Sequence, residues 1–154
     1  MSYFYKIMTH NPIDVGWEDD SFASGWGVAY CALTRDGDLA KLNLPPGYGQ
    51  GWIQKGWLSI NASVYKYCVV CVKGTDRFFV EVFDGVWKSV IGGHEPAPSE
   101  YDVKVYDLSG ITTGTITDIR LGVGDAENNE AYYDFISFHS VQPQFCTDKI
   151  LSLS

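Results

Sequence analysis

Apolar and polar residues alternate along most of this chain, and no segment carries the apolar stripe with a period of about 3.6 residues that marks an amphipathic helix. Alternation with a period of two is typical of strands that bury one face. The pattern predicts strands over residues 3–8, 26–34, 39–44, 57–60, 64–73, 78–83, 87–91, 101–106, 115–123 and 132–139. The chain is therefore expected to be all-β.

Turn-forming residues separate the predicted strands, and glycine stands at most of these junctions. The pair Asp84-Gly85 between two apolar runs is a strong hairpin signal and predicts a hairpin over residues 79–87. About ten short strands with regular turns and no helix indicate a sandwich or a closed barrel. We assign residues 1–140 to one such domain and residues 141–154 to a C-terminal tail, and expect residues 45–51 and 94–99 to be loops.

The strand over residues 132–139 has a different pattern, because residues 132–138 are apolar on both faces except at Asp134 and Ser137. A strand with apolar residues on both faces is expected to be covered on both sides. The buried position of Asp134 then requires a partner for its carboxylate.

The charge of the chain limits its partners. A formal net charge of −8 and the lack of any basic run exclude nucleic acid as an expected partner, because binding to phosphates depends on Lys and Arg. No apolar run approaches the ~20 residues that span a membrane, so no membrane insertion is expected. No signal peptide is recognised at the N-terminus. We expect a part of a virion or other assembly, or a domain of a longer extracellular protein.

The four cysteines do not form a recognisable metal or redox motif. Cys68 and Cys71 lie on one predicted strand, where residues three apart are about 10 Å apart and point to opposite faces, beyond the ~7 Å limit for a disulfide. A second CxxC is absent, so a four-thiolate zinc site cannot form. We expect thiols that pack as small apolar residues, and a bridge between Cys31 and Cys146 remains the alternative.

No catalytic motif stands out. The three histidines lack metal-ligand spacing, and no nucleophile elbow or phosphate-binding glycine loop occurs. Gly122-Val123-Gly124 lacks a third glycine and a following helix, and is interpreted as a turn. The available carboxylates are interpreted as solvated surface groups rather than a glycosidase pair. We therefore expect no enzyme.

An acidic segment over residues 14–20 is the strongest candidate for an ion site. Calcium takes six to eight oxygen ligands from carboxylates and backbone carbonyls, and a shared ion would also explain an acid at Asp134 inside an apolar strand. The alternative is a solvent-exposed acidic loop, with Asp134 hydrogen-bonded to the backbone.

Several segments together resemble jelly-roll carbohydrate-binding modules of the galactose-binding-like type. In chain order these segments are WEDD at 17–20 with SGW at 24–26, WIQ at 52–54 with INASVYKY at 60–67, Trp87 with YDVKVYDLS at 101–109, ITDIRLG at 116–122 and YYDFI at 132–136. The likeness runs from about residue 14 to residue 138. It implies a two-sheet antiparallel jelly-roll sandwich in a single domain, and a structural calcium ion held by Glu18, Asp19 and Asp134.

Carbohydrate recognition needs flat aromatic rings, because the C–H face of a sugar stacks on a ring while polar groups bind the hydroxyls. Tyr48, Trp52 and Trp57 lie in or beside the glycine-rich segment 45–56, where Gln54 and Gln50 supply amides. We predict that Tyr48, Trp52, Trp57 and Gln54 bind ligand. Two other tryptophans, at positions 26 and 87, are expected to lie in the core.

Two functions remain open from the sequence. The first is a non-catalytic carbohydrate-binding or adhesion module that recognises a glycan through exposed aromatic residues. The second is a structural or decoration protein of a virion or other extracellular assembly built on the same sandwich. For this second function the expected partner is a protein. A homo-oligomer is also expected, because the 141–154 tail contains apolar residues such as Val141 and Phe145 that can pack on a neighbouring subunit.

Overall fold

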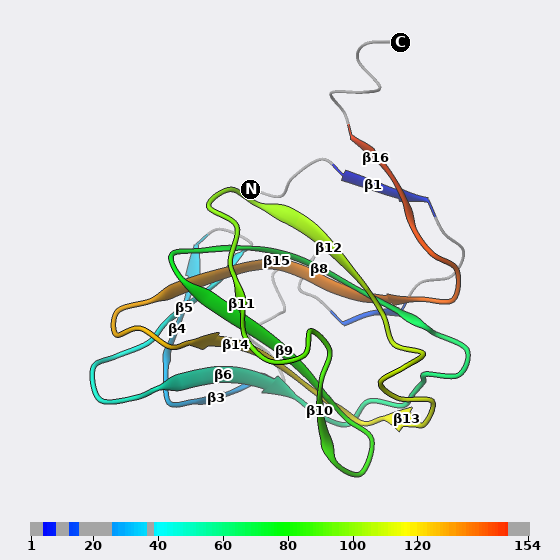
Figure 1. Cartoon of the computed structure of the whole chain (residues 1–154), viewed down its shortest axis with the longest axis horizontal. Coiled ribbons are helices and arrows are strands. Elements are labelled where there is room, and N and C mark those ends of the chain that lie inside the picture. The colour runs from blue at the N-terminus through cyan, green and yellow to red at the C-terminus, as the bar shows by residue number, and fades with distance from the viewer. Residues whose placement is uncertain (1–4, 9–12, 16–25, 37–38, 148–154) are drawn as a thin grey trace.

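Two antiparallel β-sheets form the body of the molecule (Figure 1). The computed structural model describes residues 5–8, 13–15, 26–36 and 39–147. All helical or extended elements in these ranges are β-strands, with no helix among them. The first sheet has the order β10 (Trp87–Ser89), β9 (Arg77–Phe83), β14 (Asp118–Gly124), β6 (Gln50–Lys55) and β3 (Trp26–Ala29), with β11 (Glu95–Pro96) paired to β9. The second has the order β12 (Asp102–Asp107), β8 (Tyr67–Gly74), β15 (Glu130–His139), β5 (Leu39–Asn43) and β4 (Ala32–Asp36), with β2 (Ile13–Asp14) paired to β15.

Two smaller pairs complete the described chain. β7 (Ile60–Asn61) pairs with β13 (Thr115–Ile116), and β1 (Tyr5–Met8) pairs with β16 (Gln144–Thr147). Figure 1 shows the β1–β16 pair outside the two stacked layers. Within the predicted tail, residues 144–147 therefore form a strand with the N-terminal end of the chain, and the predicted role of residues 141–154 in oligomers stays a prediction.

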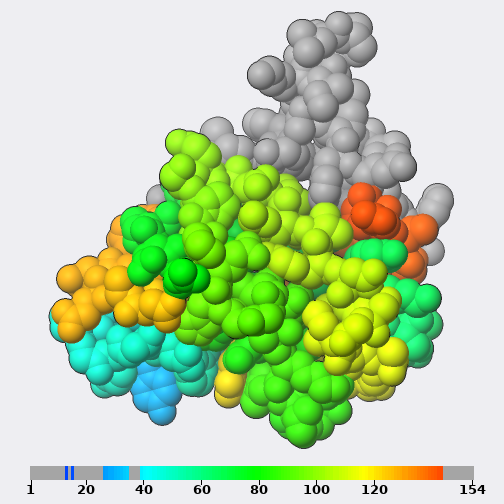
Figure 2. Space-filling view, viewed as in Figure 1, coloured from blue at the N-terminus to red at the C-terminus, as the bar shows by residue number. Residues whose placement is uncertain are grey.

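The core lies between the sheets and follows from the alternation in each strand. In the first sheet, Ile53, Leu121 and Val80 are direct cross-strand partners and are completely buried. From the second sheet Tyr133 crosses the core, and its hydroxyl donates a hydrogen bond of 2.5 Å to the carbonyl oxygen of Gly122. The buried hydroxyl is thus satisfied while the ring packs among apolar side chains. The segment between β9 and β13 (green to yellow) forms most of the face seen in Figure 2.

Several expectations about the strands are confirmed. The fold is an all-β sandwich, and β9 and β10 form the hairpin around Asp84-Gly85, with Trp87 opposite Phe83 and Gly85 at φ 112°. β15 is buried on both faces along most of its length, and the register shifts between Tyr133 and Phe135. Asp134 lies in this bulge with its side chain buried.

Other strand boundaries were wrong. The predicted strand 26–34 is two strands in different sheets, because Tyr30 takes a left-handed conformation with φ 59° and the chain crosses to the second sheet. The predicted strand 57–60 begins only at Ile60, since Trp57 has φ 60°. Conversely, residues 50–55 of the glycine-rich segment form β6, which is hydrogen-bonded on both sides to β14 and β3. Hydrogen bonds to β14 and β3 satisfy the backbone N–H and C=O groups of β6. They outweigh the weak intrinsic preference of this glycine-rich segment for the extended conformation.

The cysteines pack as expected from the strand. Cys68 and Cys71 are free, buried and on opposite faces of β8, Cys68 in the core and Cys71 in a smaller cluster with Leu39 and Tyr101. Burial raises the pKa of both thiols. Cys31 is a free, partly buried thiol, and burial raises its pKa to about 11. The described residues include no helix long and apolar enough to cross a bilayer.

Candidate functional site

The outer face of the first sheet carries aromatic and charged side chains at the positions that alternate with the core. Cross-strand pairing arranges them in three rows. One row contains Ala29, Trp52, Gly122 and Phe79; the next contains Gly27, Gln54, Arg120, Glu81 and Ser89; the third contains Asp118, Phe83 and Trp87. A polar row thus lies between two rows with aromatic rings.

Aromatic rings cluster at one end of β6. The ring of Tyr30 meets that of Trp52 edge-on with centroids 5.3 Å apart, and the ring of Tyr48 stacks on Tyr30 at 5.7 Å. Both tyrosines are exposed, Tyr30 by 58% and Tyr48 by 48%. Aromatic rings at the surface in this number present a flat apolar area to a ligand or partner.

Arg120 lies between two indole rings. Its guanidinium carbon is 4.3 Å from the ring centroid of Trp52 and 3.8 Å from that of Trp87. Trp87, expected in the core, is instead half-buried on the outer face. Its strand β10 is the edge of the sheet and places Trp87 on the same face as Phe83.

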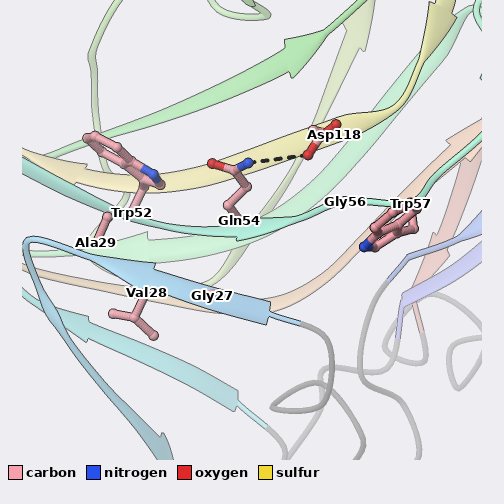
Figure 3. Close-up of a pocket in the computed structure, with 8 residues that line it drawn as sticks. All are labelled: Gly27, Val28, Ala29, Trp52, Gln54, Gly56, Trp57 and Asp118. Atoms are coloured by element: carbon pink, nitrogen blue, oxygen red, sulfur yellow. Dashed lines mark hydrogen bonds between the residues drawn. The ribbon is translucent and has the colours of Figure 1, made fainter.

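Hydrogen bonds connect the polar side chains of this face. Gln54 accepts a bond of 3.1 Å from Arg120 Nε at its Oε1 and donates one of 3.2 Å from its Nε2 to Asp118 Oδ2 (Figure 3). Asp118 Oδ1 also accepts a bond from the hydroxyl of Thr117, and Arg120 Nη1 is 3.4 Å from Glu81 Oε1. The network gives the Gln54 amide a single orientation, with its NH₂ toward Asp118.

A groove of about 350 Å³ opens beside this network. It is lined by Gly27, Val28, Ala29, Trp52, Gln54, Gly56, Trp57 and Asp118. The small outer-face residues of β3, Gly27 and Ala29, leave space next to the larger side chains of β6. In Figure 3, Trp52 and Trp57 lie at opposite ends of this groove, with Gln54 and Asp118 between them.

Trp57 is the most unusual residue of the site. Its side chain is fully exposed, so its ring gains nothing from packing within the monomer. Its backbone has φ 60°, a left-handed conformation that costs a residue with a Cβ roughly 1–2 kcal/mol. A large apolar side chain held at such a position points to a functional role.

Of the residues predicted to bind ligand, Trp52, Gln54 and Trp57 line the groove, and Tyr48 lies beyond it in the aromatic cluster. They come from a central strand and its ends rather than from one loop. The sequence reasoning missed Tyr30, Asp118, Arg120 and Trp87. The alternation of apolar and other residues along 118–124 could have predicted that Arg120 points away from the core. The position of Tyr30 could not be predicted in this way, because it depends on a local left-handed turn.

The predicted calcium site falls largely outside the described residues, which do not include Glu18 and Asp19. Asp134 is buried at the bulge of β15, and its charge contributes to the raised pKa of Cys71. Within the described part of the chain, no three His, Cys, Asp or Glu residues form a group that could hold a metal ion. The calcium site stays a prediction that requires Glu18 and Asp19 as ligands beside Asp134.

Comparison with known proteins identifies the fold. No protein-family model and no curated protein sequence matches this chain. Among solved structures, a mutant of a family 29 carbohydrate-binding module matches with a TM-score of 0.60 at 11% identity, over 90% of this chain and 93% of that one. A variant of such a module complexed with cellulohexaose matches with a TM-score of 0.61 at 9% identity, over 90% and 94%. One complexed with mannohexaose gives 0.59 at 11% identity, over 91% and 94%.

The chain therefore has the two-sheet jelly-roll fold of carbohydrate-binding modules, as the sequence resemblance implied. At these identities the likeness concerns the fold, and the function depends on the groove and the residues around it.

Proposed function

We propose that this protein is a non-catalytic module that binds a neutral glycan chain along the groove between Trp52 and Trp57. The observation that carries the proposal is Trp57, a fully exposed indole in a left-handed backbone conformation at the end of a groove. Contact with a ligand supplies the free energy that packing within the monomer does not.

The chemistry of the groove fits a sugar chain. Indole rings at its two ends offer faces on which pyranose rings stack, and Gln54 and Asp118 between them offer hydrogen-bonding groups to hydroxyls. The two tryptophans lie at opposite ends of the groove (Figure 3), so the site fits an oligosaccharide that extends from one to the other. The net charge of −8 favours a neutral ligand over an acidic one.

Mutants of a family 29 module with this fold have been solved in complex with cellulohexaose and mannohexaose, which makes these two hexasaccharides the first probes. Isothermal titration calorimetry of the whole chain should detect binding of at least one of them. Trp57→Ala and Trp52→Ala are each expected to weaken this binding at least tenfold, about 1.4 kcal/mol. Trp57→Phe, which keeps a smaller ring, should retain part of it.

Trp57→Gly makes the test sharper. Glycine tolerates φ 60° without strain, so this variant should keep the free energy of unfolding or raise it by up to about 1 kcal/mol while binding is lost. Tyr67→Ala, on β8 of the second sheet, serves as the control and should bind like the wild type. The proposal is rejected if no neutral oligosaccharide on a glycan array binds, or if the Trp57 variants bind as tightly as the control.

A further inference from the structure

Arg120 and Trp87 lie next to the groove without lining it. The guanidinium carbon of Arg120 lies 4.3 Å from the ring centroid of Trp52 and 3.8 Å from that of Trp87. Two hydrogen-bonding partners, Gln54 at 3.1 Å and Glu81 at 3.4 Å, fix the edge of the guanidinium. Its side chain is 21% exposed, so the stack is partly shielded from water.

Trp52 takes part both in this stack and in the groove. β6 has β14 on one side and β3 on the other. Arg120 comes from β14 and is not among the lining residues, which include Gly27 and Ala29 of β3 and Asp118 of β14. Arg120 therefore contacts Trp52 without lining the groove, while Trp52 itself does line it.

We propose that Arg120, supported by Trp87, is a positioning residue that sets the orientation of the Trp52 ring and the Gln54 amide. This inference rests on the proposed function of the groove. A planar guanidinium stacks between two rings and donates within its own plane, which a lysine ammonium does not do. The shape of Arg120, and not its charge alone, is thus required.

The expected results separate shape from charge. Arg120→Lys keeps the charge and should weaken binding of the hexasaccharide that the wild type binds at least fivefold, nearly as much as Arg120→Met. Trp87→Ala should also weaken binding, although Trp87 does not line the groove. The double variant Trp87→Ala with Arg120→Met should bind no worse than Arg120→Met alone, because both changes act through the same stack. Arg77→Lys, at an arginine of β9 outside the stack, is the matched control and should bind normally.

A second measurement reports on the ring without a ligand. The near-ultraviolet circular dichroism of the indoles should change in Arg120→Lys, and this change should be absent when the same substitution is made together with Trp52→Phe and Trp87→Phe. Urea denaturation of each variant identifies losses that come from unfolding.

Full affinity in Arg120→Lys, or additive effects of Trp87→Ala and Arg120→Met, would overturn the inference while leaving the glycan site intact. If the wild type binds no oligosaccharide, the proposed function fails. The dichroism spectra then decide the positioning role of Arg120 alone, and an unchanged indole signal in Arg120→Lys contradicts it.

Discussion

Asp84 connects two loops at the end of the first sheet. Its Oδ2 accepts a hydrogen bond of 2.7 Å from Lys88 Nζ and a second one from the hydroxyl of Thr112. The bond from Lys88, followed by the one from Thr112, holds the pKa of Asp84 down at about 2, compared with 3.8 for a free aspartate. One side chain thus joins the β9–β10 hairpin to the segment before β13.

This lowered pKa predicts a pH dependence of stability. A group with a lower pKa in the folded state stabilises the fold fully above its unfolded pKa, and that contribution is lost as the pH falls from about 4 to about 2. Urea midpoints of the wild type and Asp84→Asn should therefore differ at neutral pH and converge in this acidic range. Lys88→Met and Thr112→Val should each raise the Asp84 pKa measured by NMR titration of the carboxyl carbon. An Asp84 pKa near 3.8 in the wild type would contradict the prediction.

At the scale of elements, glycine makes room for the rings on the outer face. Gly122 of β14 lies between Trp52 and Phe79, and a Cβ at this position would approach the Phe79 ring to 2.1 Å. The Phe79 ring cannot easily move away, because it is 2% exposed and stacks on the His94 ring at 4.6 Å. The pair Gly122 and Gly124, interpreted from sequence as a turn, is thus part of a central strand.

We expect Gly122→Ala to destabilise the protein by about 1–3 kcal/mol, because the Phe79 ring has to leave its position. In a Phe79→Leu background the same substitution should cost less, since the two positions are in contact. Gly110→Ala is the control, at a position where a Cβ has no atom within 4 Å. Chemical denaturation measures the wild type, the three single variants and the double variant, and equal costs of Gly122→Ala in both backgrounds would show that the ring is not responsible.

Elements with clear alternation were predictable, and β6 was not. The strands β8, β9 and β14 each place apolar residues on the core face at every second position. In β6 the glycine at position 51 weakens that pattern, yet it is required, because a Cβ there would lie 2.6 Å from the carbonyl oxygen of Tyr30. Only the neighbouring strands reveal that residues 50–55 are extended and that Trp52 and Gln54 share a face.

At the scale of the whole molecule, the net charge of −8 means that acidic residues repel one another unless an ion or a solvated surface compensates. We propose that calcium, bound by Glu18, Asp19 and Asp134, contributes to the stability of the sandwich. The support from the structure is the buried carboxylate of Asp134 in the bulge of β15.

Calcium is therefore expected to raise the melting temperature relative to that of the protein in EGTA. When calcium is 100-fold above its Kd, binding adds about 2.7 kcal/mol to the free energy of unfolding. Magnesium, which is smaller and retains its water, should have less effect. Glu18→Gln and Asp19→Asn should reduce the shift with calcium. Identical melting curves in calcium and EGTA, together with no heat of calcium binding in calorimetry, would rule the ion out.

The sequence by itself determined the class of fold. A strand that buries one face has apolar and polar residues in alternation, and this pattern is visible in the sequence alone. The sequence also determined the Asp84-Gly85 hairpin and the placement of Cys68 and Cys71 on opposite faces of one strand, which depend on local geometry. Tertiary structure decided the site. Trp52, Gln54, Arg120 and Trp87 come from three strands that are distant in the chain, and only their pairing places these side chains on one surface. The position of Trp87 on the outer face was decided in the same way, since a tryptophan in a short apolar run has the same sequence signature in the core and at a binding face.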